Sequence, residues 1–585
     1  MALWMSTDHV EQRRHTVLSR SEFPDKFWNL LLILIFSCQV VVESKGEFDY
    51  LAVFLPQDES ARFGGFNLLE ISAKQDTVVF IEVPYLNLRD TYTIYAGKPK
   101  TFSYPNRLRT ALQEFHSKKA VHIRSSRRVT IKGMNALATS ADSFLALPIT
   151  QDFTHFRTIS YTQSNVIPRC VLTITSLLGK NSVNIASTRQ AFFRYRERYY
   201  RNGETLRIKL DGLEVVQVES YDVTGLLVTS YTPVAVYSGC NCVSVPRFSR
   251  DCDHIVEQMP PLTTWGTEFV SGAITPRQSG EIFRVLSSCN ATQLRVNGHG
   301  YGAVNEGEFL EFKSKALDVT RIECSNPCLV ALFIQGNSVD NRAGDPAMTV
   351  LPHTGQWVSS VSVSWSIHEE RQTEVSRILS PMTHYVMVIT KSAHKAGILM
   401  DGKVLGTGRR WTGIPNTNYS VSVFLQDLGK HQIQHINPRI KFGLISYGLG
   451  AGVSYAHPGD LDLEPNPARG CKITNIPGPA DLRSETLPDV EVQRYDNLPV
   501  VISLACLCVV LVAIMIFSVK IILRLRRSVL QLQRQEKIII VPRSNRAFQP
   551  TIDRNVSTAP YNGSRGVNDR LPVTPPPYIE ILDDP

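Results

Sequence analysis

The chain has 585 residues, of which 43% are hydrophobic and 20% charged, and it is too long for a single domain. Its formal net charge is +9, but eleven Lys and Arg stand against six Asp and Glu from Lys520 onward, so about half of the excess lies on a short tail. The long region before the tail is nearly balanced and shows no basic stripe, which argues against a nucleic-acid-binding protein.

The first element in chain order is a short apolar run, Phe27–Phe36 (FWNLLLILIF), with four basic residues before it. The run is too short to span a bilayer comfortably, and Val42 and Ser44 satisfy the small-residue rule of signal peptidase. We therefore predict a signal peptide over residues 1–44. An uncleaved signal anchor is the alternative.

Residues 47–458 repeat one pattern of strands. Four segments have the pattern strand, turn, strand: LLEISAKQDTVVFIEV from Leu68, CVLTITSLLGKNSVNIAS from Cys170, FRVLSSCNATQLRVNG from Phe283 and YVMVITKSAHKAGILMDG from Tyr385. A second strand pair follows each segment and ends in glycine, at Gly133, Gly239, Gly336 and Gly448. The starts lie roughly a hundred residues apart, which is the size of one β-sandwich domain.

The hydrophobic period in this region is two, as in Leu206-x-Ile208-x-Leu210, and no long amphipathic helix interrupts it. This pattern predicts an all-β fold of about four tandem antiparallel β-sandwiches, each with its own core. We place the repeat units at roughly 47–150, 151–262, 263–353 and 354–458.

Connectors of similar sequence follow the first three units. Each runs from Asp through apolar residues to Pro, and an aromatic residue comes next: Asp142–Pro148 then Phe153, Asp251–Pro260 then Trp265, and Asp345–Pro352 then Trp357. We interpret each connector as a fixed crossing between sandwiches, with the aromatic side chain filling the joint. The repeated Asp is expected to cap a turn by accepting nearby backbone N–H groups.

Eight cysteines lie between the signal segment and the apolar run near the C-terminus. An even number of cysteines in an oxidising compartment indicates disulfide bonds, and a zinc site at Cys240-x-Cys242 lacks a second ligand pair. Cys242 and Cys252 form a reasonable local pair, and Cys289 could pair with Cys324 or Cys328. The eight are Cys170, Cys240, Cys242, Cys252, Cys289, Cys324, Cys328 and Cys471.

No catalytic motif is present, since GxSxG, HExxH, P-loop, GxGxxG and EF-hand patterns are all missing. The segment Asp251-Cys-Asp253-His254 could hold a metal, but turn capping by Asp explains it better. Acidic residues in 460–464 could bind calcium weakly, but a solvated stalk face explains them better. We therefore predict no enzyme, no cofactor and no metal site.

A stalk rich in Pro, Gly and Asp is predicted over residues 459–498, with Cys471 as its anchor. Next, Val500–Val519 (VVISLACLCVVLVAIMIFSV) holds twenty residues without a charge, enough to span a bilayer as a helix of about 30 Å. Basic residues follow at once, so the positive-inside rule places the C-terminus in the cytosol. We predict a transmembrane helix over 499–523 and a single-pass type I plasma-membrane protein with an extracellular N-terminus.

This topology decides which glycosylation sequons are used. Asn290-Ala-Thr292 and Asn418-Tyr-Ser420 lie in the external part and are predicted to carry glycans. Asn555-Val-Ser557 and Asn562-Gly-Ser564 lie in the predicted cytosolic part and are expected to stay bare.

The tail over 524–585 is polar and basic, which predicts disorder. It ends in two short motifs. Pro575, Pro576 and Tyr578 match PPxY, whose polyproline II conformation docks into WW domains. Tyr578 and Ile581 match the YxxΦ sorting pattern.

Several segments resemble one known family. CDHIVEQMPPLTTWGTEF (252–269), DPAMTVLPHTGQW (345–357), HYVMVITK, GILMDG and KFGLISYG are similar to the N-terminal domain of the IgGFc-binding protein family. The resemblance covers most of residues 47–458. In the best-known member this domain precedes cysteine-dense von Willebrand D domains of a secreted mucus protein. Here those domains are absent, and the predicted membrane anchor stands in their place.

Together these features predict a cell-surface adhesion or recognition protein that binds an extracellular protein or glycan and recruits WW-domain proteins through its tail. A structural coat protein without a specific ligand is the first alternative. An ectoenzyme is the second.

Overall fold

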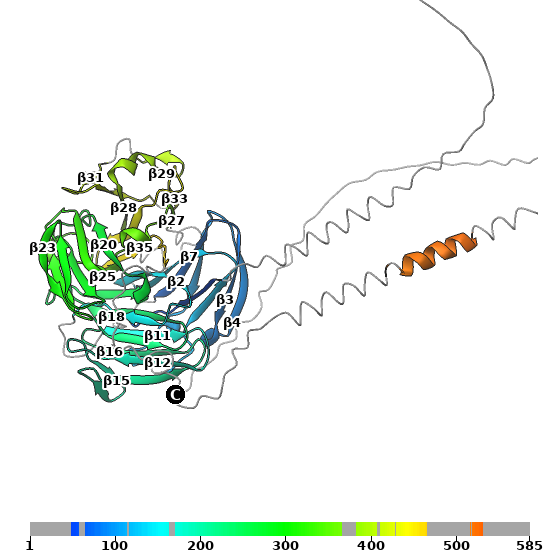
Figure 1. Ribbon diagram of the computed structural model, residues 1–585, viewed down its shortest axis with the longest axis horizontal. Coiled ribbons are helices and arrows are strands. Elements are labelled where there is room, and N and C mark those ends of the chain that lie inside the picture. The colour runs from blue at the N-terminus through cyan, green and yellow to red at the C-terminus, as the bar shows by residue number, and fades with distance from the viewer. Residues whose placement is uncertain are drawn as a thin grey trace, which may run out of the picture. The chain divides into compact units, whose positions relative to one another are not determined.

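The computed structural model describes residues 48–57, 65–113, 116–137, 139–162, 170–364, 382–405, 410–427, 429–464, 515 and 517–529. The chain divides into two compact units, Met1–Thr486 and Leu487–Pro585. Every described strand belongs to the first unit (Figure 1). The predicted signal peptide, Cys471, Asn555, Asn562 and the two tail motifs lie outside the described residues.

The second unit is described only as helix, over 515 and 517–529. Across the described residues, no helix has both the length and the apolar character needed to cross a membrane. Most of the predicted span 499–523 lies outside them.

The first strand group, β1–β9, forms two antiparallel sheets with the orders β4-β3-β6-β1-β9 and β5-β2-β7-β8. Its strands are β1 (Phe48–Ala52), β2 (Phe66–Ala73), β3 (Thr77–Val83), β4 (Leu88–Ile94), β5 (Lys100–Tyr104), β6 (Val121–Ser125), β7 (Val129–Leu137), β8 (Ser140–Ala146) and β9 (Pro148–Ile149).

The second strand group, β10–β19, also forms two sheets, with the orders β10-β17-β12-β15 and β14-β13-β16-β11-β18-β19. Its strands are β10 (His155–Arg157), β11 (Cys170–Ser176), β12 (Asn181–Ala186), β13 (Phe193–Tyr195), β14 (Arg198–Tyr200), β15 (Thr205–Leu210), β16 (Val215–Ser220), β17 (Leu227–Ser230), β18 (Val234–Val243) and β19 (Asp253–Gln258).

The third strand group, β20–β26, shares one long strand, β25, between its two layers. Its order is β23-β22-β25-β21-β24, and β20 and β26 also pair with β25. Its strands are β20 (Gly266–Ser271), β21 (Ile282–Ser287), β22 (Thr292–Val296), β23 (His299–Val304), β24 (Phe309–Lys313), β25 (Thr320–Ile334) and β26 (Ala347–Val350).

The fourth strand group, β27–β35, forms sheets with the orders β27-β33-β29-β30 and β31-β32-β28-β34-β35. Its strands are β27 (Ser360–Ser364), β28 (Thr383–Lys391), β29 (Ile398–Met400), β30 (Lys403–Val404), β31 (Thr412–Gly413), β32 (Tyr419–Leu425), β33 (Lys430–His435), β34 (Gly443–Gly450) and β35 (Val453–Pro458).

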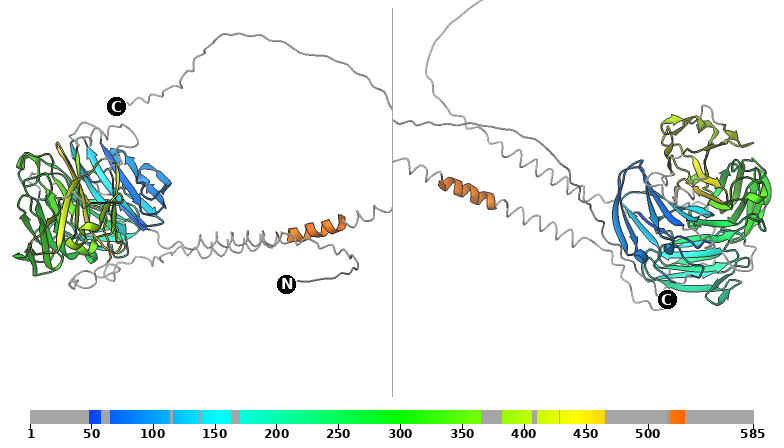
Figure 2. Two further views of the ribbon diagram at one scale, coloured as in Figure 1. Left: turned by 90° about the horizontal axis from the view of Figure 1, so that it is seen from above. Right: turned by 180° about the vertical axis from the view of Figure 1, so that it is seen from behind.

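Short 3-10 helices are the remaining regular elements of the described part of the first unit. They are η1 (Pro84–Leu86), η2 (Asn106–Leu108), η3 (Leu262–Thr264), η4 (Asn337–Val339), η5 (Thr354–Gln356) and η7 (Ser392–Gly397). The two further views in Figure 2 show that sheets make up this body. The all-β prediction is confirmed.

One sheet order recurs in the four strand groups. The inner sheets contain β5-β2-β7-β8, β16-β11-β18-β19, β24-β21-β25-β26 and β32-β28-β34-β35. Each inner sheet therefore has at one end the strand that follows β7, β18, β25 or β34 in the chain, which is β8, β19, β26 or β35. In Figure 1 the groups, coloured blue, teal, green and yellow-olive in chain order, surround a common centre.

The strand–turn–strand segments found in the sequence are not hairpins. β2 and β3 belong to different sheets, as do β11 and β12, and β28 and β29. At each of these turns the chain therefore crosses from the inner sheet to the outer sheet of its group.

In the third group the second strand pair is replaced by the single strand β25. Its register with β20 shifts, since Gly266 lies opposite Cys328 while Glu268 lies opposite Glu323. This bulge bends the strand and lets it serve both layers.

The expectation that each sandwich has its own core is wrong in part: one apolar cluster lies wholly within the fourth strand group, around Val361, Val388 and Ile433, but the larger clusters are shared between groups. One apolar cluster joins Phe156 and Val236 of the second group to Leu286 and Phe333 of the third. Another joins the third group to the fourth, and a third joins the first to the second. The reason is that strands such as β11, β18 and β19 are buried along their whole length and present an apolar side chain to both neighbours.

The predicted connectors are strands of this shared interior. β8, β19 and β26 are buried throughout. Phe153, Trp265 and Trp357 are buried as well, with 1%, 2% and 4% of their surface exposed.

The start of the predicted stalk also belongs to the body. Leu461 and Leu463 are buried in the cluster that contains the second and third groups. Asp460 pairs with Arg128, and Asp462 with Lys441. Residues 459–464 are therefore packed, and the solvated acidic face expected there is wrong, because the leucines between the acids anchor the segment.

Candidate functional site

A single carboxylate lies where the four inner sheets meet. Asp142 on β8 is fully buried. Its Oδ1 accepts hydrogen bonds from the N–H groups of Ser143 (2.8 Å) and Ala456 (3.1 Å). Its Oδ2 accepts from the N–H groups of Val256 (3.1 Å) and Met348 (3.2 Å). Because these donors lie on β8, β35, β19 and β26, one side chain ties all four strand groups together.

Two side chains of β19 extend this central network. Asp253 accepts from the N–H groups of Ala141 at 3.2 Å and His254 at 2.7 Å. Glu257 accepts from the N–H of Val350 at 3.1 Å. The buried acids thus satisfy backbone donors that the closely packed strands leave without a partner in the same sheet.

Burial dominates the electrostatics of this centre. It raises the pKa of Asp142 and of Glu257 well above the ordinary range, although backbone N–H donors oppose the rise. Burial and the neighbouring Asp345 raise the pKa of Asp253 in the same way. Burial also raises the pKa of Asp345 to about 7, and Asp251 adds to this effect. Groups so shielded from solvent hold the fold and cannot meet a substrate.

The repeated connector Asp was interpreted from the sequence as a local turn cap, and this is wrong in part. Asp142 accepts the N–H of the next residue, Ser143, but Asp251 accepts that of Ser338, 87 residues away. Asp253, two residues after Asp251, accepts the N–H of its neighbour His254. The other donors to Asp142 and Asp253 come from distant segments, up to 314 residues away in sequence. The repeated Asp in the connectors was the sequence signal for a structural role of these carboxylates. Interpreting each Asp as a cap of its own turn missed the backbone donors on distant strands.

The Asp251-Cys-Asp253-His254 segment is used for folding. His254 Nδ1 lies 2.9 Å from the carbonyl oxygen of Cys240, and burial lowers the pKa of His254 to about 3, so the ring is neutral. Among the residues that the structure describes, no three His, Cys, Asp or Glu side chains are grouped so that they could hold a metal ion.

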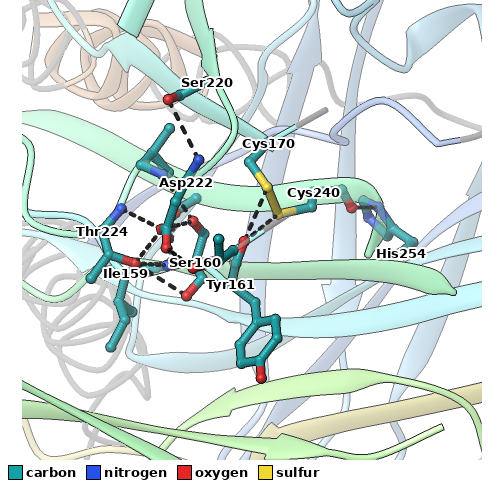
Figure 3. The surroundings of a disulfide bond; sticks show 12 residues. Ile159, Ser160, Tyr161, Cys170, Ser220, Asp222, Thr224, Cys240 and His254 are labelled. Atoms are coloured by element: carbon teal, nitrogen blue, oxygen red, sulfur yellow. Dashed lines mark hydrogen bonds between the residues drawn. A yellow bond between two sulfur atoms is a disulfide. The ribbon is translucent and has the colours of Figure 1, made fainter. Parts of the chain in front are cut away.

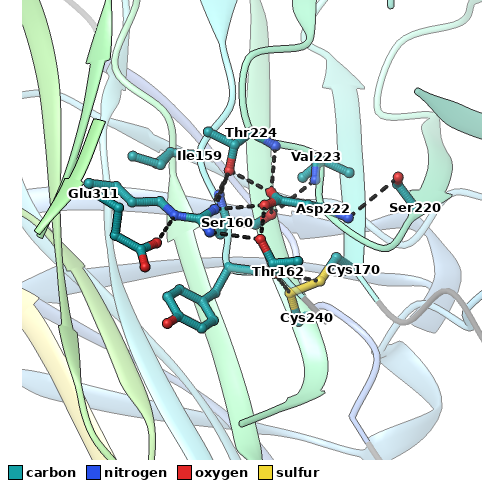
Figure 4. Close-up of polar contacts among 12 residues, drawn as sticks. Ile159, Ser160, Thr162, Cys170, Ser220, Asp222, Val223, Thr224, Cys240 and Glu311 are labelled. Carbon is teal, nitrogen blue, oxygen red and sulfur yellow. Dashed lines mark hydrogen bonds and ion pairs between the residues drawn. A yellow bond between two sulfur atoms is a disulfide. The ribbon is translucent and has the colours of Figure 1, made fainter. Parts of the chain in front are cut away.

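A buried arginine, Arg284, joins the second strand group to the third. Figure 4 shows the residues around it, among them Ser160, Asp222 and Glu311. Arg284 on β21 donates to Asp222 Oδ2 at 2.7 Å and to Glu311 Oε2 at 2.7 Å. It also donates to the Ser160 carbonyl and the Thr162 hydroxyl, each at 2.8 Å. All three guanidinium nitrogens donate to acceptors of the two strand groups, which makes this a positioning contact between sheets.

The charges of this cluster stabilise one another. Burial alone would raise the pKa of Asp222, but Arg284 and the Thr224 and Thr162 hydroxyls bring it below the ordinary value. Burial alone would lower the pKa of Arg284, but Asp222 and Glu311 raise it. Removing either partner would leave an uncompensated charge in the interior.

A disulfide bond lies beside this cluster (Figure 3). Cys170 on β11 and Cys240 on β18 face each other across the sheet and are joined. The carbonyl oxygen of Tyr161 lies 3.3 Å from Cys170 Sγ. The bond therefore fixes the inner sheet next to the loop that receives Arg284.

The other cysteines are mostly placed as well. Cys242 is joined to Cys252, as the sequence indicated. Cys324 is joined to Cys328, a pairing that we did not consider from the sequence, and it closes the bulge of β25. Cys289 is also disulfide-bonded.

The first and fourth strand groups meet at a polar seam. Lys132 on β7 donates to the Ser362 carbonyl at 3.0 Å and lies 3.6 Å from Glu70. Glu70 also accepts from the Ser364 hydroxyl. One cavity at this seam is lined by Leu68, Glu70, Thr101, Lys132, Gly133, Met134, Ser143, Ser364 and His457.

Most of the polar groups around this cavity are paired, but the buried Ser143 hydroxyl has no hydrogen-bond partner among the described residues. Burial and the neighbouring Lys132 lower the pKa of His457 to about 3, and its Nδ1 lies 2.8 Å from the Pro458 carbonyl oxygen. The contacts of Lys132 and Glu70 with Ser362 and Ser364 therefore join the first strand group to the fourth.

The two predicted external glycosylation sites lie on the surface. Asn290 and Asn418 are both exposed. The Asn290 side chain accepts from the N–H of Glu306 at 3.1 Å. Both positions are sterically open to a glycan, and their modification stays a prediction.

A disulfide-bonded body of antiparallel sheets, with its polar clusters used for folding, places this chain in the class of β-rich, disulfide-bonded proteins. Residues 142–448, more than half of the chain, match the sequence model of the IgGFc binding protein family. The chain belongs to this family. The match begins at the central Asp142.

The IgGFc-binding protein of Homo sapiens is 23% identical over 346 residues. The aligned part is 58% of this chain and 6% of that protein. The chain therefore corresponds to a small fraction of the relative's length, and what the whole relative does is not carried over with the match.

Proposed function

We propose that this chain is a cell-surface recognition protein whose β-rich body binds an extracellular partner. One observation carries the proposal: the disulfides Cys170–Cys240, Cys242–Cys252 and Cys324–Cys328 all lie inside the stretch that matches the family. Disulfide bonds persist in extracellular and secretory compartments. A scaffold of shared cores and buried polar anchors is rigid enough to present a binding surface.

Membrane anchoring is part of the proposal and rests on the sequence of residues 499–523. It is tested by mapping glycans on the full-length chain with single Asn→Gln variants and glycosidase treatment. We expect Asn290→Gln and Asn418→Gln each to remove one glycan, and Asn555→Gln and Asn562→Gln to change nothing. A glycan on Asn555 would reverse the orientation and overturn the surface-receptor proposal.

Partner binding is tested with the full-length chain displayed on cells. Proximity labelling on intact cells should recover a secreted or surface protein or a glycoconjugate, and recovery should fall when the disulfides are reduced beforehand. IgG Fc belongs among the probes because the human relative is named for it. Labelling equal to that of a surface protein of unrelated fold would favour a coat without a specific ligand.

The tail proposal has its own test. Tyr578 belongs to both PPPY and YIEI, and both kinds of partner bury the tyrosine ring. We expect Tyr578→Ala to abolish binding of a WW domain to the tail peptide and to slow internalisation, while Pro576→Ala impairs WW binding alone. Full WW binding by the Tyr578→Ala peptide would remove the motif from the proposal.

A further inference from the structure

One edge of the second strand group concentrates positive charge. Between residues 189 and 209, seven Arg and Lys stand against two Glu. This cationic edge, residues 189–209, contains β13, β14 and β15. Six of its cations are exposed: Arg189, Arg196, Arg198, Arg201, Arg207 and Lys209. The net charge of the whole body does not indicate this edge, because positive and negative residues are nearly balanced over the body as a whole.

The topology places these cations on a rim. β14 is the terminal strand of one sheet, and β15 is the terminal strand of the other sheet of the same group. In Figure 1, β15 lies at the outer border of the teal sheets. The charges are therefore spread along an edge and do not converge on one point.

Aromatic rings support the arginines of β14 and the following turn. The Arg198 guanidinium lies 4.6 Å from the centroid of the Tyr200 ring. The Arg201 guanidinium lies 5.2 Å from the ring centroids of both Phe192 and Tyr199. Stacking covers a face of each guanidinium, and the planar fork at its edge matches the oxygens of a sulfate or carboxylate group. Arg198 already uses one of these nitrogens, since its Nη2 donates to Glu204 Oε1 at 3.2 Å.

The cations of β15 have a regular spacing. Burial alternates along the strand, so Arg207 and Lys209 point outward while Leu206, Ile208 and Leu210 are buried. Two residues along a strand are about 7 Å apart. Within the described residues, no hydrogen bond or ion pair holds the Arg207 or Lys209 side chain. These two charges are thus available to a ligand.

Arg194 on β13 shows what a structural cation at this place looks like. It is paired with Glu219 of β16 through its Nε at 2.6 Å. Burial works against the charge of Arg194, but the hydrogen bond to Glu219 outweighs it and raises the pKa of Arg194. Arg207 and Lys209 lack such a partner, so folding does not explain them.

We propose that the cationic edge binds a sulfated polysaccharide. A flexible chain with a repeated anionic group can follow cations that are spread over two sheet edges and the turns between them. Addition of an acidic peptide as a further strand is disfavoured, because cations that line an edge strand oppose strand pairing. The proposal names the ligand class for the extracellular recognition role and rests on that role for its biological setting.

The test uses the full-length chain purified in detergent and surface-immobilised heparin as the probe. In detergent the measurement does not depend on which side of a membrane the body occupies, so it can fail or succeed independently of the glycan mapping. The test variant is Arg207→Glu with Lys209→Glu. The control is Lys313→Glu with Lys315→Glu, which changes two exposed cations two residues apart, at the end of edge strand β24.

We expect the test variant to weaken heparin binding at least about tenfold and the control to stay within about twofold, because only the first pair belongs to the edge. Binding should also weaken as salt is raised and should be lost with chemically desulfated heparin. The proposal would be overturned if the test and control variants lost heparin affinity equally. It would also be overturned if the test variant kept its heparin affinity at an unchanged melting temperature. Poly-L-glutamate that binds as tightly as heparin would also overturn it, in favour of an acidic polypeptide ligand.

Discussion

Asp142→Asn should destabilise the whole body, although the two side chains have nearly the same shape. The carboxylate accepts four backbone N–H groups, two on each oxygen. An Asn amide keeps one acceptor oxygen, while its NH₂ group would face two N–H donors that it cannot satisfy. Each buried donor left unpaired costs about 1–3 kcal/mol, so two cost about 2–6 kcal/mol. Loss of the buried charge offsets part of this, which favours the lower half of the range.

The assay is denaturant unfolding of the purified full-length chain, followed by the fluorescence of the buried Trp265 and Trp357. The control is Asp152→Asn, which makes the same chemical change at an exposed residue and should stay within about 0.5 kcal/mol. Because the donors to Asp142 come from all four strand groups, both tryptophans should report the same loss. A change of less than about 0.5 kcal/mol for Asp142→Asn would refute the idea that this carboxylate holds the groups together.

Asp345→Asn tests the buried acids through pH. Burial raises the pKa of Asp345 in the folded state to about 7 from 3.8, so the folded state binds the proton more tightly than the unfolded state. The stability of the natural chain relative to the variant should therefore fall by roughly 4 kcal/mol as pH rises from about 4 to 7. A stability difference that stays constant over this pH range would contradict the prediction. Arg284→Lys should lower the free energy of unfolding by about 3–5 kcal/mol in the same assay. The reason is that an ammonium group cannot reach all the acceptors of the guanidinium and leaves a buried carboxylate poorly paired. A melting temperature equal to that of the natural chain would show that the cluster is dispensable. Replacing Cys170 and Cys240 by Ser opens a link between residues 70 apart in sequence and should cost about 4 kcal/mol of unfolding free energy. The reduced natural chain should lose at least as much, because reduction also opens Cys242–Cys252 and Cys324–Cys328. An unfolding midpoint that reduction leaves unchanged would mean that the Cys170–Cys240 bond does not form.

Much of the local structure could be read from the sequence. The period of two in Leu206-x-Ile208-x-Leu210 appears as the alternately buried strand β15. The four strand–turn–strand segments appear as strands at the expected residues, and Cys242 and Cys252 pair as neighbours. These features depend on residues a few positions apart, so local composition and spacing were sufficient to predict them.

By itself the sequence determined the all-β class, the family and the pairing of most cysteines of residues 47–458 into disulfides, because strand periodicity, motif residues and cysteine number are properties of the chain order. Only the tertiary structure decided how the strands share sheets and cores. Three of the four donors to Asp142 lie 114, 206 and 314 residues away, and the cationic edge combines β14 and β15, which are terminal strands of two different sheets. Contacts of this kind arise when apolar faces of distant strands are buried together, and no local pattern of residues records which distant strand will supply the partner.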